Sequence, residues 1–258
     1  MVNILLHGCN GRMGRVITGL AKDTEDIRIT AGIDAYGEAA GDYPVYATCA
    51  EVPQETIDNT DVVVDFSTAA AMDALLHFVG EKGLPCVLCT TGLSEAQTAL
   101  LQETAQKTAI LKSANMSVGI NLLLKLLKEN AAVLDAAGFD IEIVEKHHRK
   151  KLDAPSGTAI ALGDAVNESL QKEGKTYPYV YGRADRRSER PQAEIGISAV
   201  RGGTIVGDHD VIFAGTDEVV TLSHRAYSRD VFATGALAAA RYLKGKAPGL
   251  YGMDGVVG

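Results

Sequence analysis

The residues with the most evident chemistry lie together between positions 145 and 159. The six residues after Glu145 include two histidines and four Lys/Arg side chains. Of these, His147, His148 and Lys151 can donate protons or bind anions. Such a cluster suits a site for a small anionic substrate that must receive a proton. Taken alone, a basic run is more often a solvated strand end.

A predicted helix begins directly after this cluster. Ser156 opens a Ser-Gly-Thr sequence, and apolar residues then recur at helical spacing, at positions 160, 162, 166 and 170. A helix that begins here points the N–H groups of its first turn, including those of Gly157 and Thr158, at whatever lies in front of it. An ordinary N-capped helix is the plainer interpretation of the same residues.

A second candidate site is the glycine-rich turn at positions 8–14, Gly-Cys-Asn-Gly-Arg-Met-Gly. An apolar strand precedes it, a helix over about 12–22 follows it, and Asp34 ends the next predicted strand. This context is typical of a dinucleotide site, where glycines let the backbone approach a pyrophosphate and the carboxylate accepts from ribose hydroxyls. A structural turn with a surface aspartate is the alternative. The predicted cofactor contacts in the turn are Gly8, Cys9, Asn10, Gly11, Arg12 and Met13.

These residues must be positioned by the elements around them, and up to about residue 116 short apolar strands alternate with helices. The predicted strands cover 4–6, 29–33, 62–66, 86–89 and 109–111. The alternation predicts a mostly parallel, doubly wound sheet with ligands beyond the carboxyl ends of its strands. Residues that follow these strands are candidates for contacts with a nicotinamide and its ribose, although each polar one alone is also a possible helix cap. They are Ser67, Thr90, Thr91, Asn115 and Met116.

The pattern changes after a strongly apolar helix predicted at 117–135, whose leucines cover too wide an arc for a surface helix. We expect this helix to be buried between domains or subunits. Strand patterns then appear at 141–147, 194–200, 204–213 and 218–224. The last three are not separated by helices, which predicts an antiparallel or mixed sheet. Between them and the helix after Ser156, residues 175–192 form a predicted loop with four arginines.

An alanine-rich helix at 230–244 resembles the first part of the chain, so we expect the chain to return there. The predicted fold class is α/β, a Rossmann-type doubly wound parallel sheet plus an α+β domain with a mixed open sheet. The predicted domains are a discontinuous dinucleotide-binding domain, 1–117 and 229–258, and a substrate-binding and tetramerisation domain, 118–228.

Composition excludes several classes of protein. A net charge of −8 over 258 residues argues against nucleic acid as the main partner. No apolar run approaches the length of a membrane span, and the N-terminus lacks a basic signal-peptide region. Cys86 and Cys89 have no second Cys/His pair at zinc spacing nearby. We therefore expect reduced thiols, no metal site, no membrane partner and a cytoplasmic protein.

Several motifs together resemble those of one enzyme family. They are the turn at 8–14, Val-Asp-Phe-Ser at 64–67, Thr-Thr-Gly at 90–92, the segment 113–121, the segment 145–159, Arg-Gly-Gly at 201–203 with Gly207 and His209, and Ser-Arg at 228–229. Over essentially its whole length, the chain resembles the 4-hydroxy-tetrahydrodipicolinate reductase (dihydrodipicolinate reductase) family of the diaminopimelate and lysine pathway. The sequence departs from the family at Cys89, where glycine is more usual, and at Met116, where an aromatic residue is common.

This resemblance implies NAD(P)H-dependent reduction of a small anionic cyclic dicarboxylate. It also implies a Rossmann domain closed by the C-terminal helix, domain closure about a hinge, and a homotetramer built through the second domain. Carried over by motif, His147 and Lys151 are the catalytic acid/base pair, and His148, Gly157 and Thr158 bind the substrate. The cofactor contacts then extend beyond the glycine turn to Asp34, Cys89, Thr90, Thr91, Ser113, Ala114, Asn115 and Met116.

The choice between NADH and NADPH depends on Asp34. Its carboxylate suits the ribose hydroxyls of NADH, whereas the 2′-phosphate of NADPH would bring further negative charge beside it. The next residues, Ala35 and Tyr36, are not cationic, which leaves Arg12 as the nearby residue that can compensate. We therefore expect a preference for NADH, with NADPH still usable.

Two other classes of function remain open from the sequence. One is an aldehyde dehydrogenase that uses Cys89 as its nucleophile. The other is a non-enzymatic NAD-sensing module, which would not explain the cluster at 145–159.

Overall fold

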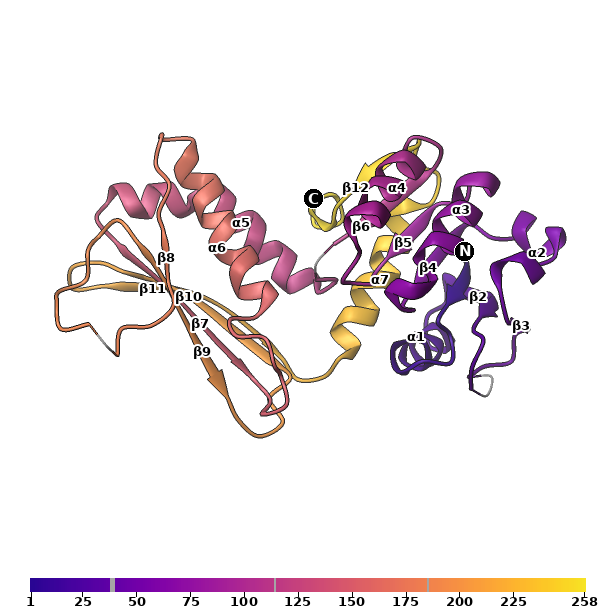
Figure 1. The fold of residues 1–258 in the computed structure, drawn as a ribbon, viewed down its shortest axis with the longest axis horizontal. Coiled ribbons are helices and arrows are strands. Elements are labelled where there is room, and N and C mark those ends of the chain that lie inside the picture. Colours follow the sequence, from indigo (N-terminus) through magenta and orange to yellow (C-terminus); the bar gives the residue numbers. More distant parts are fainter. Residues whose placement is uncertain (38–39, 114, 185) are drawn as a thin grey trace. The chain divides into compact units, whose positions relative to one another are not determined.

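The computed structural model describes residues 1–37, 40–113, 115–184 and 186–258 (Figure 1). The chain divides into two compact units. Unit 1 comprises Met1–Val118 and Asp230–Gly258, and unit 2 comprises Gly119–Arg229. Ala114, one of the expected cofactor contacts, lies outside the described residues.

Unit 1 is built on a seven-stranded sheet in the order β12-β6-β5-β4-β1-β2-β3, in which every paired strand is parallel to its neighbour. The strands are β1 (Val2–His7), β2 (Ile27–Ile33), β3 (Val45–Tyr46), β4 (Val62–Asp65), β5 (Cys86–Leu88), β6 (Ala109–Lys112) and β12 (Gly249–Tyr251). The strand order reverses between β1 and β4. In doubly wound sheets, ligands bind at this switch point, outside the carboxyl ends of the strands.

Both faces of this sheet are covered, which explains the unbroken apolar runs of its strands. Ile4 and Leu6 of β1 join one buried cluster with residues of α1 and α7, whereas Leu5 joins the opposite cluster with α3 and α4. The helices of unit 1 are α1 (Arg12–Lys22), α2 (Gln54–Asp58), α3 (Met72–Lys82), α4 (Glu95–Ala105) and α7 (Asp230–Leu243), with 3-10 turns η1 (Cys49–Glu51), η2 (Ala69–Ala71) and η3 (Met253–Gly255).

Unit 2 has a five-stranded mixed sheet in the order β11-β10-β7-β9-β8. Its strands are β7 (Asp140–His147), β8 (Tyr179–Val180), β9 (Ile195–Arg201), β10 (Gly207–Ala214) and β11 (Val219–Ala226). β10 runs antiparallel to β7 and β11, while β9 runs parallel to β7 and β8. The predicted Rossmann-type sheet with a second, mixed sheet is therefore confirmed.

Two helices of unit 2 pack on the same core as this sheet. Alternate residues of β7, such as Ile141 and Ile143, are buried in one cluster with α5 (Val118–Ala136) and α6 (Gly157–Gln171). Figure 1 shows both helices beside the sheet. α5 is less covered than its apolar arc predicts. Leu123 and Leu127 are buried, but Leu122 is 44% exposed and Val133 is 67% exposed. Burial of its outer side between domains or subunits stays a prediction.

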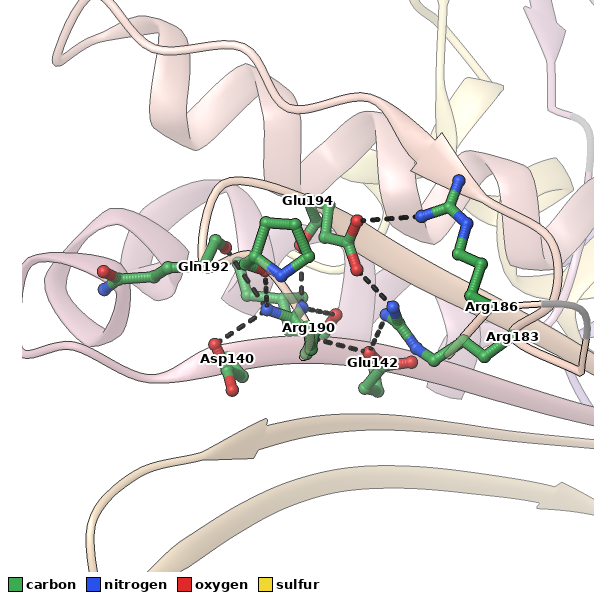
Figure 2. Close-up of polar contacts among 9 residues, drawn as sticks. Asp140, Glu142, Arg183, Arg186, Arg190, Gln192 and Glu194 are labelled. Atoms are coloured by element: carbon green, nitrogen blue, oxygen red, sulfur yellow. Dashed lines mark hydrogen bonds and ion pairs between the residues drawn. The ribbon is translucent and has the colours of Figure 1, made fainter. Parts of the chain in front are cut away.

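Three arginines of the predicted loop at 175–192, Arg183, Arg186 and Arg190, make internal ion pairs (Figure 2). Arg190 pairs with Asp140 at 2.7 Å and with Glu142 at 2.8 Å. Arg183 pairs with Glu142 at 2.6 Å and also with Glu194. These contacts fasten the loop to β7, and the loop contains the short strand β8, which the sequence did not predict.

Candidate active site

The buried carboxylate of Glu145 is the centre of the candidate site in unit 2. Its Oε2 accepts hydrogen bonds from His147 Nδ1 at 2.6 Å and Arg201 Nη1 at 2.7 Å. Its Oε1 accepts from Arg201 Nη2 at 2.6 Å and from the backbone N–H of Ser156 at 2.9 Å. Arg201 reaches this carboxylate because β9 runs parallel to β7 and places Arg201 opposite His147.

These contacts set the charge of both members of the Glu145–His147 pair. Burial raises the pKa of Glu145, but hydrogen bonds from Arg201, His147 and Ser156 outweigh it and lower the pKa below its usual value. Burial, with smaller contributions from the charges of Lys151 and Arg201, lowers the pKa of His147 despite the favourable carboxylate. At neutral pH, the contact is therefore a hydrogen bond from a neutral imidazole to a carboxylate, rather than an ion pair.

The tautomer of His147 follows from this arrangement. An ionised carboxylate only accepts hydrogen bonds, so Nδ1 must carry the single proton of the neutral ring. Nε2 then has a free lone pair. It faces Gly207, where an added Cβ would lie 3.0 Å from Nε2. His147 is thus built to accept a proton or a hydrogen bond at Nε2.

His209 on β10 contacts both Ser156 and His147. Its Nε2 is 3.1 Å from Ser156 Oγ, and its ring meets that of His147 edge to face with centroids 5.1 Å apart. Burial, together with the neighbouring His147, lowers the pKa of His209 to about 4. Ser156 is also the N-cap of α6, since its Oγ accepts from the N–H of Ala159 at 3.2 Å.

The other predicted substrate residues lie around this network. Lys151 Nζ is 2.8 Å from Asp153 Oδ2, and its charge is near enough to contribute to lowering the pKa of His147. Gly157 and Thr158 are the first two residues of α6. His148 lines a pocket of about 560 Å³ together with Arg149, Lys150, Gly203, Thr204, Val206 and Arg229. Four of those seven lining residues are basic, which suits an anionic ligand.

In unit 1, the glycine turn forms part of a second pocket, of about 430 Å³, at the carboxyl ends of β1, β2 and β4. Gly8 has φ +77°, and an added Cβ would lie 2.6 Å from the carbonyl oxygen of Phe66. A Cβ on Gly14 would lie 2.3 Å from the carbonyl oxygen of Gly8. Side chains at these positions would displace the turn, so the glycines are required for its close approach to the strands.

Asp34 is tied to the same turn. Its Oδ2 accepts from the N–H of Asn10 at 2.9 Å, and its Oδ1 accepts from the N–H of Tyr36 at 3.0 Å. Asp34, Gly8, Asn10 and Gly11 all line the pocket. Glycines, a helix N-terminus and a carboxylate therefore meet as a dinucleotide site requires, and the residues present fit an NAD(P) cofactor.

Other predicted cofactor residues do not line this pocket. The Cys9 and Met116 side chains are buried in the core, Met13 packs against the same core, and Arg12 is exposed. Thr90 is buried, Cys89 is partly buried and Thr91 is exposed. Ser113 Oγ donates to the carbonyl of Asn115 at 2.8 Å, which fixes the turn after β6. Because the Cys9 side chain is buried in the core, any cofactor contact from Cys9 must come from its backbone.

A buried pair at the switch point was not predicted from the sequence. His7 Nδ1 lies 2.8 Å from Asp65 Oδ1, and Ser67 Oγ donates to the same oxygen at 2.6 Å. His7 and Ser67 also line the pocket of unit 1. The sequence does carry a signal for this pair, since His7 and Asp65 are polar residues that each end an apolar strand.

Comparisons with known proteins agree with this arrangement. The family models for the N-terminus and the C-terminus of dihydrodipicolinate reductase match residues 2–116 and 119–257. The chain belongs to the dihydrodipicolinate reductase family. A 4-hydroxy-tetrahydrodipicolinate reductase from Caldanaerobacter subterraneus subsp. tengcongensis is 49% identical, over 100% of this chain and 98% of that protein. The resemblance drawn from the motifs is confirmed, and the chain is an oxidoreductase of the dihydrodipicolinate reductase family.

Solved structures show the same fold. The dipicolinate-bound dihydrodipicolinate reductase from Paenisporosarcina sp. TG-14 superposes with a TM-score of 0.78 at 23% identity, covering 98% of each chain. An engineered D-amino acid dehydrogenase bound to NADP+ has a TM-score of 0.59 at 15% identity, covering 98% of this chain and 93% of its own. The fold shared with the dihydrodipicolinate reductase family is thus one that pyridine-nucleotide dehydrogenases use.

Proposed function

We propose that this chain reduces 4-hydroxy-tetrahydrodipicolinate to tetrahydrodipicolinate with NAD(P)H, as a step of diaminopimelate and lysine biosynthesis. Relatives that match this chain over 98% or more of its length are named 4-hydroxy-tetrahydrodipicolinate reductase. The structural observation that carries the proposal is the Glu145 carboxylate, which holds the neutral His147 imidazole and the start of α6 together. A proton-transfer group and an anion-binding helix N-terminus thereby belong to one cluster.

The reaction fixes what these residues have to do. A bound NAD(P)H supplies a hydride from C4 of its nicotinamide. The substrate takes up this hydride and one proton, and its 4-hydroxyl leaves as water. Negative charge that builds on the ring must therefore be neutralised by a proton donor within hydrogen-bond reach.

Lys151 is the proposed donor, because its ammonium group offers N–H donors only, whereas the lowered pKa of His147 leaves that ring neutral and able to accept. The lone pair at Nε2 lets His147 accept a hydrogen bond from a water or from the substrate, and so share in proton transfer. Asp153, 2.8 Å from Lys151, holds the ammonium in place until substrate binds.

The two carboxylates of the substrate need cations and N–H donors. We assign them to His148 and to the backbone at Gly157 and Thr158, where the first turn of α6 favours negative charge. The basic pocket that His148 lines supports this assignment.

We assign the nucleotide to the pocket of unit 1, with the turn from Gly8 to Met13 against the pyrophosphate and Asp34 against the adenosine ribose. Cys89, Thr90, Thr91, Ser113, Asn115 and Met116 are proposed to lie near the nicotinamide. The preference for NADH is part of this proposal, because Asp34 is fixed in the pocket by two backbone N–H groups. Arg12 is exposed at the start of α1, where it can reach a 2′-phosphate.

We further propose a cytoplasmic homotetramer built through residues 118–228. The exposed apolar residues of α5, Leu122 and Val133, support burial of this helix against another copy. Among the described residues, no helix has the length and apolar character needed to cross a membrane.

The alternative in which Cys89 is a nucleophile is not supported. Burial, with the nearby charge of Asp65, raises the pKa of Cys89 well above its usual value, so the thiol stays protonated. Within the described part of the chain, no group of three or more His, Cys, Asp or Glu side chains is arranged to hold a metal.

Dipicolinate tests the assigned anion site, since this planar ring presents two carboxylates and cannot accept hydride in the same way. It should inhibit competitively with the dicarboxylate substrate at fixed NADH. Inhibition that competed with the nucleotide alone would place the anion site in unit 1 and contradict the assignment of Gly157 and Thr158.

A further inference from the structure

Glu145 neither donates nor accepts the transferred proton in the proposed reaction, yet it joins three elements of unit 2. It lies on β7, accepts two hydrogen bonds from Arg201 on β9, and accepts another from the residue that caps α6. Its side chain is fully buried. Together with His147, four donors converge on two oxygens, so this carboxylate is saturated with partners inside the protein.

The four donors differ in whether they could also act as hydrogen-bond acceptors. The N–H of Ser156 and the guanidinium of Arg201 are always donors, whereas an imidazole nitrogen can be a donor or an acceptor. Only the proton on His147 Nδ1 therefore depends on Glu145 being a carboxylate. Removing the acceptor at Oε2 would allow the ring proton to move to Nε2.

We infer that Glu145 is a positioning residue that fixes His147 in the tautomer with a free lone pair at Nε2 and holds the first turn of α6 beside it. The inference rests on the proposed function, because it explains how His147 is kept ready as an acceptor while Lys151 donates. Glu145 itself touches neither substrate nor cofactor in this account and acts through its neighbours.

The charged and titratable groups that face His147 are consistent with this role. Glu145 comes from β7, Lys151 from the segment after it, Arg201 from β9 and His209 from β10. Burial and the two cations favour the neutral ring, and Glu145 opposes them. The carboxylate therefore orients the ring without leaving it protonated at neutral pH.

Glu145→Gln is the informative variant. Its one carbonyl oxygen is needed by the N–H of Ser156 and by Arg201 Nη2, so the amide NH₂ should take the Oε2 position, where it donates to His147 Nδ1 and displaces Arg201 Nη1. We expect ¹⁵N NMR to show the ring proton moved to Nε2, and kcat to fall roughly 10- to 100-fold, the range found when the hydrogen-bond partner that orients a metal-bound imidazole is lost. KM for the dicarboxylate should change less than about threefold, because α6 keeps its contact.

A double variant separates positioning from general damage. In a His147→Ala background, Glu145→Gln should cause no further loss of kcat. Glu142→Gln is the matched control, since Glu142 is also on β7 and ion-paired but touches neither His147 nor Ser156. It should leave both the tautomer and kcat unchanged. A retained Nδ1–H in Glu145→Gln, or an equal loss of kcat in the His147→Ala background, would overturn the inference.

Arg201→Met provides a second test if Glu145→Gln does not fold. It removes a cation that lowers the pKa of His147 and leaves Glu145 less neutralised, so the pKa of His147 measured by NMR should rise. An unchanged or lower pKa of His147 would contradict the network.

These NMR measurements need no turnover. If the wild-type protein failed to reduce the substrate, the proposed function would fall while the Glu145 measurement still gave its own answer.

Discussion

Lys151 provides the first test at the level of single residues. Lys151→Ala should lower kcat by roughly 10²-fold, the usual effect of losing a positioned proton donor, and leave the affinity for NADH nearly unchanged. Steady-state kinetics and nucleotide titration measure the two quantities. Lys146→Ala is the control, because Lys146 belongs to the same basic run but pairs with Asp210 at 2.8 Å. Equal losses in both variants would remove the special role of Lys151.

Asp34 and Arg12 provide a test of cofactor choice. Asp34→Ala should shift the ratio of kcat/KM values toward NADPH by roughly tenfold, equivalent to about 1.4 kcal/mol, because it removes a negative charge beside the 2′-phosphate. Arg12→Ala should shift the ratio toward NADH. Both ratios must be measured at one ionic strength, since the effects are electrostatic. A wild-type preference of tenfold or more for NADPH would show that Asp34 does not decide the choice.

His209 makes a prediction about pH and stability. Its pKa is about 4 in the folded protein, below the ordinary value for histidine, so the folded state holds it neutral. As the pH falls below about 6.5, His209 binds a proton in the unfolded chain but stays neutral in the folded chain. The free energy of unfolding therefore decreases. The expected loss is about 2 kcal/mol between pH 7.5 and pH 5, at about 1.36 kcal/mol per pKa unit.

Urea unfolding at those two pH values measures this loss, and His209→Gln supplies the comparison. Other buried groups contribute equally to the pH dependence of stability in the wild type and in the variant. The difference between the two pH dependences therefore isolates His209. The variant should lose less stability than the wild type over this range. Identical pH dependences would mean that His209 is not held neutral by burial.

The sequence predicts candidate reactive residues but not their partners. His147 and Lys151 could be singled out as candidates because their spacing before a helix start is visible in the chain. Arg201 lies 56 residues from Glu145, and only the parallel pairing of β7 with β9 brings them together. The cores that enclose Cys9 and Met116 are likewise assembled from distant segments, so the sequence did not show that these side chains face inward.

At the level of elements, the arginine loop depends on one glycine of β9. A Cβ on Gly196 would lie 1.8 Å from Glu142 Oε2, so Glu142 would have to leave Arg183 and Arg190. Gly196→Ala should therefore destabilise the protein by roughly 1–3 kcal/mol, the usual cost of overpacking. Gly202→Ala is the control, because its Cβ would meet no atom within 4 Å. Equal unfolding free energies for the two variants would show that the network is not needed.

Long elements were predicted well because their periodicity extends over several turns. The helix expected at 230–244 is α7, Asp230–Leu243, and the strand expected at 141–147 is β7, Asp140–His147. β3 and β8 contain two residues each, too few to show a period. They exist because neighbouring strands supply hydrogen-bonding partners, which is a tertiary effect absent from the local sequence.

At the level of the whole molecule, two features are combined in one chain. Unit 1 holds a glycine turn that a Cβ would block and a carboxylate that suits a ribose, and unit 2 holds a neutral imidazole, a lysine and a helix N-terminus. The final helix, α7, packs into the core of unit 1 although more than a hundred residues of unit 2 precede it. A candidate nucleotide site and a candidate proton-transfer site in the same protein are what a reductase requires.

The most direct test is oxidation of NADH or NADPH by the purified protein with freshly prepared 4-hydroxy-tetrahydrodipicolinate. The absorbance of the reduced nicotinamide should fall only when protein, nucleotide and this intermediate are all present. Dipicolinate should slow the reaction, and Lys151→Ala should nearly abolish it. A folded protein that binds NADH yet leaves it unoxidised in the presence of the intermediate would contradict the account.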